Sequence, residues 1–110
     1  MTRKSANGLN KAITVWLNTR GHRGWRNNTV GIYDPVTKRY RKNFSTERGV
    51  GDIIGISKSG THFEIETKIG RDTMSIFQVA HRAEVRKRNG IFLMVGSFDD
   101  FLVQAEREGL

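Results

Sequence analysis

The sequence contains no cysteine, which excludes disulfide bonds, thiolate metal sites and cysteine nucleophiles and is compatible with a reducing compartment. Its single proline, together with a hydrophobic fraction of 36%, argues against a disordered chain. It has no apolar run near the roughly 18 residues that a membrane-spanning helix needs, and no apolar segment of a signal peptide follows the basic residues 1–4. We therefore expect a cytoplasmic protein that does not contact a membrane.

Acidic residues are scarce in the first half of the chain. Residues 1–48 contain 11 Lys+Arg but only two acids, for a net charge of +9, whereas residues 49–110 contain 8 Lys+Arg and 9 Asp+Glu, for a net charge of −1. The formal net charge of all 110 residues is +8. A strongly basic half favours a polyanionic partner, most often a nucleic acid, although a solubilising surface would have the same composition.

Apolar residues recur at helical spacing in three segments. Residues 7–19 predict an amphipathic helix that ends before Gly21. Residues 72–89 predict a second helix, and Ser97 is expected to cap a third helix that begins at about Phe98. The inward face predicted for the second helix consists of Met74, Phe77 and Ala80, and Val79 and Ala83 are left open as additions to it. The inward face predicted for the third consists of Phe98, Phe101, Leu102 and Ala105.

Alternation and turn residues predict the strands. Residues 24–44 are expected to form a β-hairpin with a very basic second strand, because Asp34 and Pro35 favour a turn between two strand-like stretches. Residues 53–56 form a short apolar run, residues 61–68 alternate strictly, and residues 91–95 predict a strand buried on both faces. The alternating strand would carry Phe63, Ile65 and Thr67 on one face and His62, Glu64, Glu66 and Lys68 on the other.

These elements follow the order α-β-β-β-β-α-β-α and predict a single α/β domain over residues 1–110, with a mixed central β-sheet flanked by helices. The strand, helix and buried strand near the C-terminus imply a crossover connection between parallel strands. Trp16 and Trp25 are expected in the hydrophobic core rather than on a surface that stacks against bases.

Two acids and a lysine are expected at one end of this sheet. Asp52 precedes one strand and Glu66 lies on the next, so that a hairpin brings both carboxylates together. Two carboxylates with open water positions suit Mg²⁺, and Lys68, on the same strand face as Glu66, could orient or help to deprotonate a water beside the ion. The competing interpretation is that Glu64, Glu66 and Lys68 form an ordinary solvated strand face.

The ordered set of motifs resembles a nuclease family. The matching residues are Gly49-Val50-Gly51-Asp52, Ile65-Glu66-Thr67-Lys68 and Gln78, together with residues 26–31, 38–42 and 52–55 upstream. They resemble the PD-(D/E)xK nuclease superfamily and, more closely, the small stand-alone phage members of its VRR-NUC branch, the virus-type replication-repair nucleases. The resemblance covers the chain from about Leu9 to Phe101 and implies a restriction-endonuclease-like fold.

The resemblance also implies roles for individual residues. Asp52, Glu66 and the backbone carbonyl of Thr67 would bind Mg²⁺ or Mn²⁺, Lys68 would position the attacking water, and Gln78 would support the site from its helix. The family's usual proline before the motif aspartate is Gly51 here. Many relatives also carry a glutamate on the first helix, where this chain has Asn7 and Asn10. A second metal site is therefore in doubt, unless Glu64 compensates.

Small stand-alone members of the family resolve branched DNA, such as four-way (Holliday) junctions, as homodimers. By resemblance, we expect a Mg²⁺-dependent endodeoxyribonuclease of phage type that acts on branched DNA inside a host cell as a homodimer. A two-fold dimer would place two sites on a two-fold-symmetric junction. The candidate DNA-binding residues are Arg20, Arg23, Arg26, Asn28, Lys38, Arg39, Arg41 and Lys42.

Two other functions remain open. The missing helix glutamate would suit a non-catalytic DNA-binding module with the same fold, and a sequence-specific duplex endonuclease of homing or restriction type is not excluded. Gly31-Ile32-Tyr33 matches only the first half of a GIY-YIG nuclease signature. The histidines lack zinc-binding spacing. His62 shares the strand face of Glu66 and could lie at the rim of the site, and His81, three residues after Gln78, could point near it, but the preferred interpretation places both at the surface.

Overall fold

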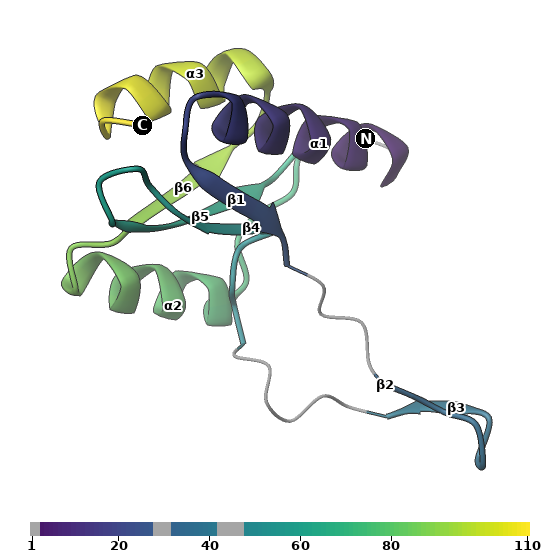
Figure 1. Ribbon diagram of the computed structural model, residues 1–110. Coiled ribbons are helices and arrows are strands. Elements are labelled where there is room, and N and C mark those ends of the chain that lie inside the picture. Colours follow the sequence, from purple (N-terminus) through teal and green to yellow (C-terminus); the bar gives the residue numbers. More distant parts are fainter. Residues whose placement is uncertain (1–2, 28–31, 42–47) are drawn as a thin grey trace.

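The computed structural model describes residues 3–27, 32–41 and 48–110 (Figure 1). The helices are α1 (Arg3–Thr19), α2 (Ile76–Lys87) and α3 (Phe98–Arg107). The strands are β1 (Arg23–Arg26), β2 (Ile32–Asp34), β3 (Arg39–Arg41), β4 (Ile53–Ile56), β5 (His62–Thr67) and β6 (Ile91–Val95). Five strands precede α2, one more than predicted. In the described ranges, no helix combines the length and apolar character that crossing a membrane requires.

Four of the strands form a mixed sheet in the order β1-β4-β5-β6. β1 and β5 each pair antiparallel with β4, whereas β6 pairs parallel with β5. The parallel pair is possible because α2 carries the chain back along the sheet between β5 and β6. The predicted α/β class, mixed sheet and crossover are therefore confirmed.

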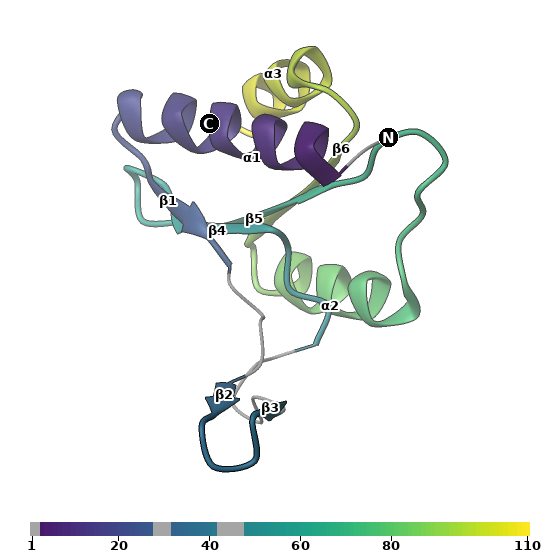
Figure 2. The ribbon, with the colours of Figure 1, turned by 90° about the vertical axis from the view of Figure 1, so that its right-hand side faces the viewer.

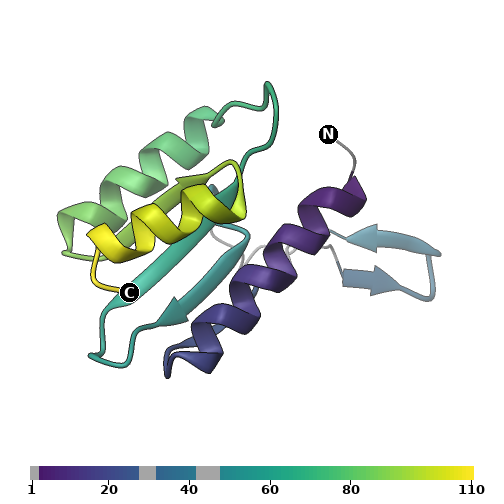
Figure 3. The ribbon, with the colours of Figure 1, turned by 90° about the horizontal axis from the view of Figure 1, so that it is seen from above.

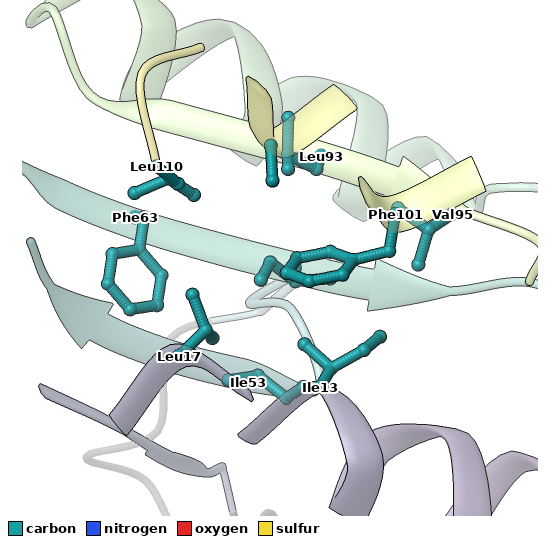
Figure 4. Close-up of a cluster of buried hydrophobic side chains, with 10 residues drawn as sticks. Ile13, Leu17, Ile53, Phe63, Leu93, Val95, Phe101 and Leu110 are labelled. Atoms are coloured by element: carbon teal, nitrogen blue, oxygen red, sulfur yellow. The ribbon is translucent and has the colours of Figure 1, made fainter. Parts of the chain in front are cut away.

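Helices cover both faces of this sheet. α1 and α3 lie side by side on one face, and α2 lies on the other (Figures 1 and 3). Between the sheet and the α1–α3 layer is an apolar core that includes Phe63 and Ile65 of β5 and Phe101 of α3. Figure 4 shows Phe63 and Phe101 among its side chains. Ile13 and Leu17 of α1 complete it, as the helical spacing predicts.

The face of α2 that meets the sheet differs from the predicted one. Phe77 and Val79 are 45% and 44% exposed, and Ala80 and Ala83 are also exposed. The less exposed residues of the helix are Gln78, His81, Arg82 and Val85, which recur at helical spacing. The prediction was wrong because it assumed an apolar layer beneath α2. Glu64 and Glu66 lie buried there, and polar helix residues are needed to bond with them.

The predicted hairpin over residues 24–44 is only partly correct. β2 and β3 pair as expected, with Tyr33 opposite Tyr40, and form a separate two-stranded ribbon (Figure 2). β1 instead joins the main sheet beside β4, which lies far along the chain. On this edge strand Gly24 faces the core, and Trp25 is 46% exposed rather than buried. Trp16 packs against the core, as predicted.

Candidate functional site

The candidate site begins where the pairing of β4 and β5 ends. Ile53 and Ile65 form the last registered pair of these two strands. Asp52 then bonds with β5 through its side chain: its Oδ2 accepts from the backbone N–H of Thr67 at 3.1 Å and from the Thr67 hydroxyl at 2.7 Å. Its carbonyl accepts from the N–H of Asn27 at 2.8 Å. These bonds fix the Asp52 carboxylate at this end of the sheet.

Glu66 is the buried acid of the site, with 4% of its surface exposed. Its Oε1 lies 3.4 Å from Nζ of Lys68, whose side chain is 18% exposed. Burial, followed by the negative charge of Asp52, raises the pKa of Glu66 to about 7. The ammonium of Lys68 and a hydrogen bond from Gln78 lower that pKa but do not compensate fully. Asp52 is thus close enough to oppose the ionisation of Glu66.

Gln78 connects the site to the start of α2. Its backbone N–H donates to Oγ of Ser75 at 3.1 Å, and its side-chain oxygen accepts from the N–H of Ser75 at 2.9 Å, which together form a capping box. With the amide oxygen occupied, the amide nitrogen is left to donate to Glu66. The same side chain therefore begins the helix and holds the buried acid.

The loop before Asp52 fits closely between β5 and α2. Gly49 has φ of 81°, and a Cβ there would overlap the backbone carbonyl of Phe77. The guanidinium of Arg48 lies over the Phe77 ring, 4.5 Å from its centroid. Gly51 donates its N–H to Oε1 of Glu64 at 3.0 Å. The absence of side chains at the two glycines is what allows this close approach, and a proline at residue 51 would lack the N–H.

A buried carboxylate with two histidines lies beside this site. Glu64 is 2% exposed; Nε2 of His62 lies 2.7 Å from its Oε2, and Nε2 of His81 lies 2.8 Å from the same oxygen. Burial alone would raise the pKa of Glu64, but bonds with His62, Gly51 and His81 outweigh it, and the pKa is lowered. His81 was predicted at the surface, but its side chain is 14% exposed. Two signals were present in the sequence: the strand face that His62 shares with Glu64 and Glu66, and the position of His81 three residues after Gln78.

Asp52, Glu66, Thr67, Lys68 and Gln78 are thus brought together as the motif spacing predicted. Any ion here would have two carboxylates and backbone or water oxygens, since within residues 3–27, 32–41 and 48–110 no three His, Asp or Glu side chains form a group that could hold a metal. On the first helix, the two residues considered above in place of a glutamate, Asn7 and Asn10, are amides and carry no charge. Asn7 is exposed and accepts from Arg26, and Asn10 is 3% exposed with no partner for its Oδ1 among the described residues.

The candidate DNA-binding residues are distributed over three elements. Arg20 follows α1 and lies over the Trp16 ring at 4.6 Å, and Arg23 and Arg26 are exposed on β1. Lys38 and Arg39 are exposed on the β2–β3 ribbon. Arg41 belongs to β3, whereas the predicted contacts Asn28 and Lys42 lie outside the described residues.

No protein-family model, curated protein or solved structure matches this chain. A functional assignment therefore depends on the chemistry of the side chains at the end of β4 and β5. The residues that matter most for it are Asp52, Glu66 and Lys68.

Proposed function

We propose that this protein is a metal-dependent DNA endonuclease of the PD-(D/E)xK type, similar to the VRR-NUC nucleases, with a restriction-endonuclease-like fold. It hydrolyses phosphodiester bonds in branched DNA and acts as a homodimer. The observation that carries this proposal is the convergence of Asp52, Glu66 and Lys68 at one end of the sheet, where an ammonium lies 3.4 Å from a buried carboxylate. An ordinary solvated strand face would not bury its acids in this way.

The chemistry of the donor set fits a divalent cation. Asp52 and Glu66 repel each other, and burial adds to the cost of ionising Glu66. A cation between two such carboxylates would remove both penalties, and oxygen ligands are those that Mg²⁺ and Mn²⁺ prefer. With only two acidic ligands and the Thr67 carbonyl, such an ion would keep several waters, which is usual for Mg²⁺ in phosphoryl-transfer sites.

When bound, Mg²⁺ would polarise a phosphoryl oxygen and make a bound water more acidic. The side chains have complementary tasks. Lys68 orients the attacking water and stabilises negative charge on the phosphate as the bond to it forms. Thr67 fixes the orientation of Asp52 through its N–H and hydroxyl, and Gln78 holds Glu66 through its amide. Positioning of this kind accounts for a large part of the rate in phosphoryl transfer.

The basic surface supplies affinity for the DNA backbone. Arg20, Arg23, Arg26, Lys38 and Arg39 are exposed cations, and contacts from such residues to phosphates are sensitive to salt and carry little sequence information. This favours recognition of DNA shape over recognition of a base sequence. Two copies of the chain related by a two-fold axis would present two sites to a four-way junction, and sedimentation of the free protein tests for that dimer.

A cleavage assay with matched variants tests the proposal. Labelled four-way junction, linear duplex and single strand are incubated with the protein in Mg²⁺, Mn²⁺ or EDTA. We expect junction cleavage that requires the metal and is reduced by a factor of about 10³ or more in Glu66→Gln. Glu84→Gln, which changes an exposed acid on α2, should cleave normally. Cleavage that persists in EDTA or in Glu66→Gln contradicts the metal mechanism.

One observation favours a second candidate, a non-catalytic DNA-binding module. Asn10 is a buried polar residue of α1, an amide where many family members carry an acid, and it cannot contribute charge to a metal site. Tight junction binding with no cleavage in either metal would support the module. Cleavage of one duplex sequence in preference to junctions would instead support a restriction-type enzyme.

A further inference from the structure

The tip of the β2–β3 ribbon exposes an apolar residue among cations. Four residues connect Asp34 to Arg39, and the loop is closed by a hydrogen bond of 2.8 Å from the N–H of Lys38 to the carbonyl of Asp34. The Asp34 carboxylate also accepts from the N–H of Val36 at 2.9 Å. Val36 is 88% exposed, the largest value for any large hydrophobic side chain in the described residues. The turn is thus ordered by hydrogen bonds to the carbonyl and the carboxylate of Asp34 and not by burial of Val36.

The conformation of Lys38 is a second unusual feature of this tip. Lys38 has φ of 58°, in the left-handed region where glycine or asparagine is favoured. Hairpin loops are often built around a type I turn, and nothing in such a turn requires a lysine in this conformation. The ribbon therefore carries a cation at a residue where glycine would be easier to accommodate. Arg39 follows directly and is also exposed. Two cations therefore lie on the chain just after the tip that carries Val36.

We propose that Pro35 and Val36 form an apolar wedge that enters an open base step at a DNA branch point, while Lys38 and Arg39 contact the phosphates beside it. This inference rests on the proposed function and names the substrate feature that the protein recognises. DNA-binding proteins of the minor groove frequently insert apolar side chains, proline and isoleucine among them, between base steps. The wedge and the cations need no particular base sequence.

The wedge would give selectivity for DNA structure. Insertion into a continuous duplex requires unstacking that costs a few kcal/mol per step. At a branch, mismatch or other interruption the stack is already open, and this cost is smaller. The same apolar contact therefore favours branched DNA over linear duplex, whereas phosphate contacts strengthen binding to both. Recognition of this kind operates through deformability rather than base edges.

A binding experiment in EDTA separates the wedge from catalysis. The full-length chain is mixed with a four-way junction that carries the fluorescent base 2-aminopurine at the branch point, and with a linear duplex of the same sequence. We expect binding to increase the fluorescence at the branch. Val36→Ser should abolish most of this increase and reduce the preference for junction over duplex about tenfold, the lower value expected for burying a valine side chain.

Two control variants make the result specific. Val15→Ser changes another exposed valine, 57% exposed on α1, and should behave as the wild type. Lys38→Asn keeps a residue suited to the left-handed conformation but removes the charge, so it should weaken binding to junction and duplex alike. Because Val36 is almost fully exposed, its replacement should leave the folded structure intact, which circular dichroism verifies.

The outcomes distinguish the wedge from the nuclease proposal. If Val36→Ser shows the fluorescence increase and the preference of the wild type, the wedge is wrong even if the protein cleaves junctions in Mg²⁺. An equal loss of affinity for both substrates in Val36→Ser would likewise overturn it, because the ribbon would then act on the backbone alone. If the wild type binds no DNA, the proposed function itself fails, and the wedge fails with it.

Discussion

The carboxylate of Asp52 takes the place of a strand partner for Thr67. Backbone pairing between β4 and β5 stops at Ile53 and Ile65. Two residues further along β5, the N–H of Thr67 donates to the side chain of Asp52 instead, to its Oδ2 at 3.1 Å. The Thr67 hydroxyl donates to the same oxygen at 2.7 Å. The end of the β4–β5 pair and the placement of a candidate metal ligand are therefore one structural feature.

Removal of the Thr67 hydroxyl should destabilise the protein and misplace Asp52. A hydrogen bond to a charged acceptor contributes about 1.5–3 kcal/mol, and Thr67→Val removes one while a β-branched side chain is kept. We expect a decrease of about that size in the unfolding free energy measured with urea. Thr67→Ser keeps the hydroxyl, so its unfolding free energy should be close to that of the wild type. Equal unfolding free energies for Thr67→Val and Thr67→Ser would contradict the role of this bond.

Gly49 should tolerate substitution far less well than Gly60. Both have positive φ, 81° and 93°, so alanine at either residue incurs backbone strain of about 1–2 kcal/mol. A Cβ on Gly60 would meet nothing within 4 Å, whereas one on Gly49 would overlap the backbone of Phe77 at the start of α2. Gly49→Ala should therefore lower the unfolding free energy by at least about 2 kcal/mol more than Gly60→Ala. Similar costs would contradict the close packing of this loop on α2.

The strand that carries the site could be predicted from the sequence because its alternation is local. Phe63 and Ile65 enter the apolar core, and Glu64 and Glu66 lie on the opposite face, as the strict alternation of residues 61–68 requires. The spacing of the motifs also predicted that Asp52 lies close to Glu66, because a short hairpin leaves little freedom in how its two strands align.

The orientation of α2 could not be predicted in the same way. Hydrophobic periodicity assigns Phe77 and Ala80 to the inner face, but the helix turns His81 and Val85 inward. The orientation of the helix is determined by the buried Glu64 on β5, because its carboxylate requires hydrogen-bond partners and His81 is one of them. A sequence window along the helix holds no information about an acid on β5. β1 was missed for a related reason, since its partner β4 is distant in sequence and its register is not local.

His81 should contribute much more to stability than His62. Both histidines bond with buried Glu64, but the side chain of His81 is 14% exposed and that of His62 46% exposed. His81→Leu leaves the acid with fewer partners in a buried site, which costs about 2–3 kcal/mol, whereas His62→Leu should cost about 1 kcal/mol or less. Urea unfolding at pH 7 measures both, and equal losses would contradict the central place of His81 in the cluster.

The stability of the protein at low pH should depend on Glu64 and its bonds with the two histidines. Burial would raise the pKa of Glu64, but its bonds with His62, Gly51 and His81 lower it below the usual 4.5. The stability that ionised Glu64 contributes is present above pH 4.5 and is lost as the pH falls through its lowered folded-state pKa. We expect His81→Leu to titrate Glu64 at a higher pH than the wild type, and NMR of the side-chain carboxyl carbon measures the shift. An unchanged titration would contradict the bond.

Salt dependence should identify which cations contact phosphates. Each phosphate contact that is lost lowers the slope of log K against log salt concentration by about 1. We expect that change for Lys38→Asn and for Arg39→Gln on the β2–β3 ribbon. Arg88→Gln removes a cation that is bonded to Glu84 on α2 and should leave the slope unchanged. Equal slopes in all three variants would show that the ribbon does not bind the DNA backbone.

The stability of the metal-free protein should fall between pH 5 and pH 8 because of Glu66. Burial and then the charge of Asp52 raise its pKa to about 7, above the usual 4.5, so the folded state holds this proton more tightly than the unfolded chain does. The stabilisation is complete below pH 4.5 and is lost as the pH rises through 7, with a total of about 3 kcal/mol.

Urea unfolding in EDTA measures this loss of stability, and Glu66→Gln, which stays neutral, should show a correspondingly smaller decrease over the same pH range. The difference between the two proteins isolates the contribution of Glu66 from that of every group they have in common. Mg²⁺ at pH 8 should restore stability to the wild type but not to Glu66→Gln, because only the ionised carboxylate pair attracts the cation. Identical pH profiles would show that Glu66 is not held in this raised state, and a response of both proteins to Mg²⁺ would place the cation elsewhere.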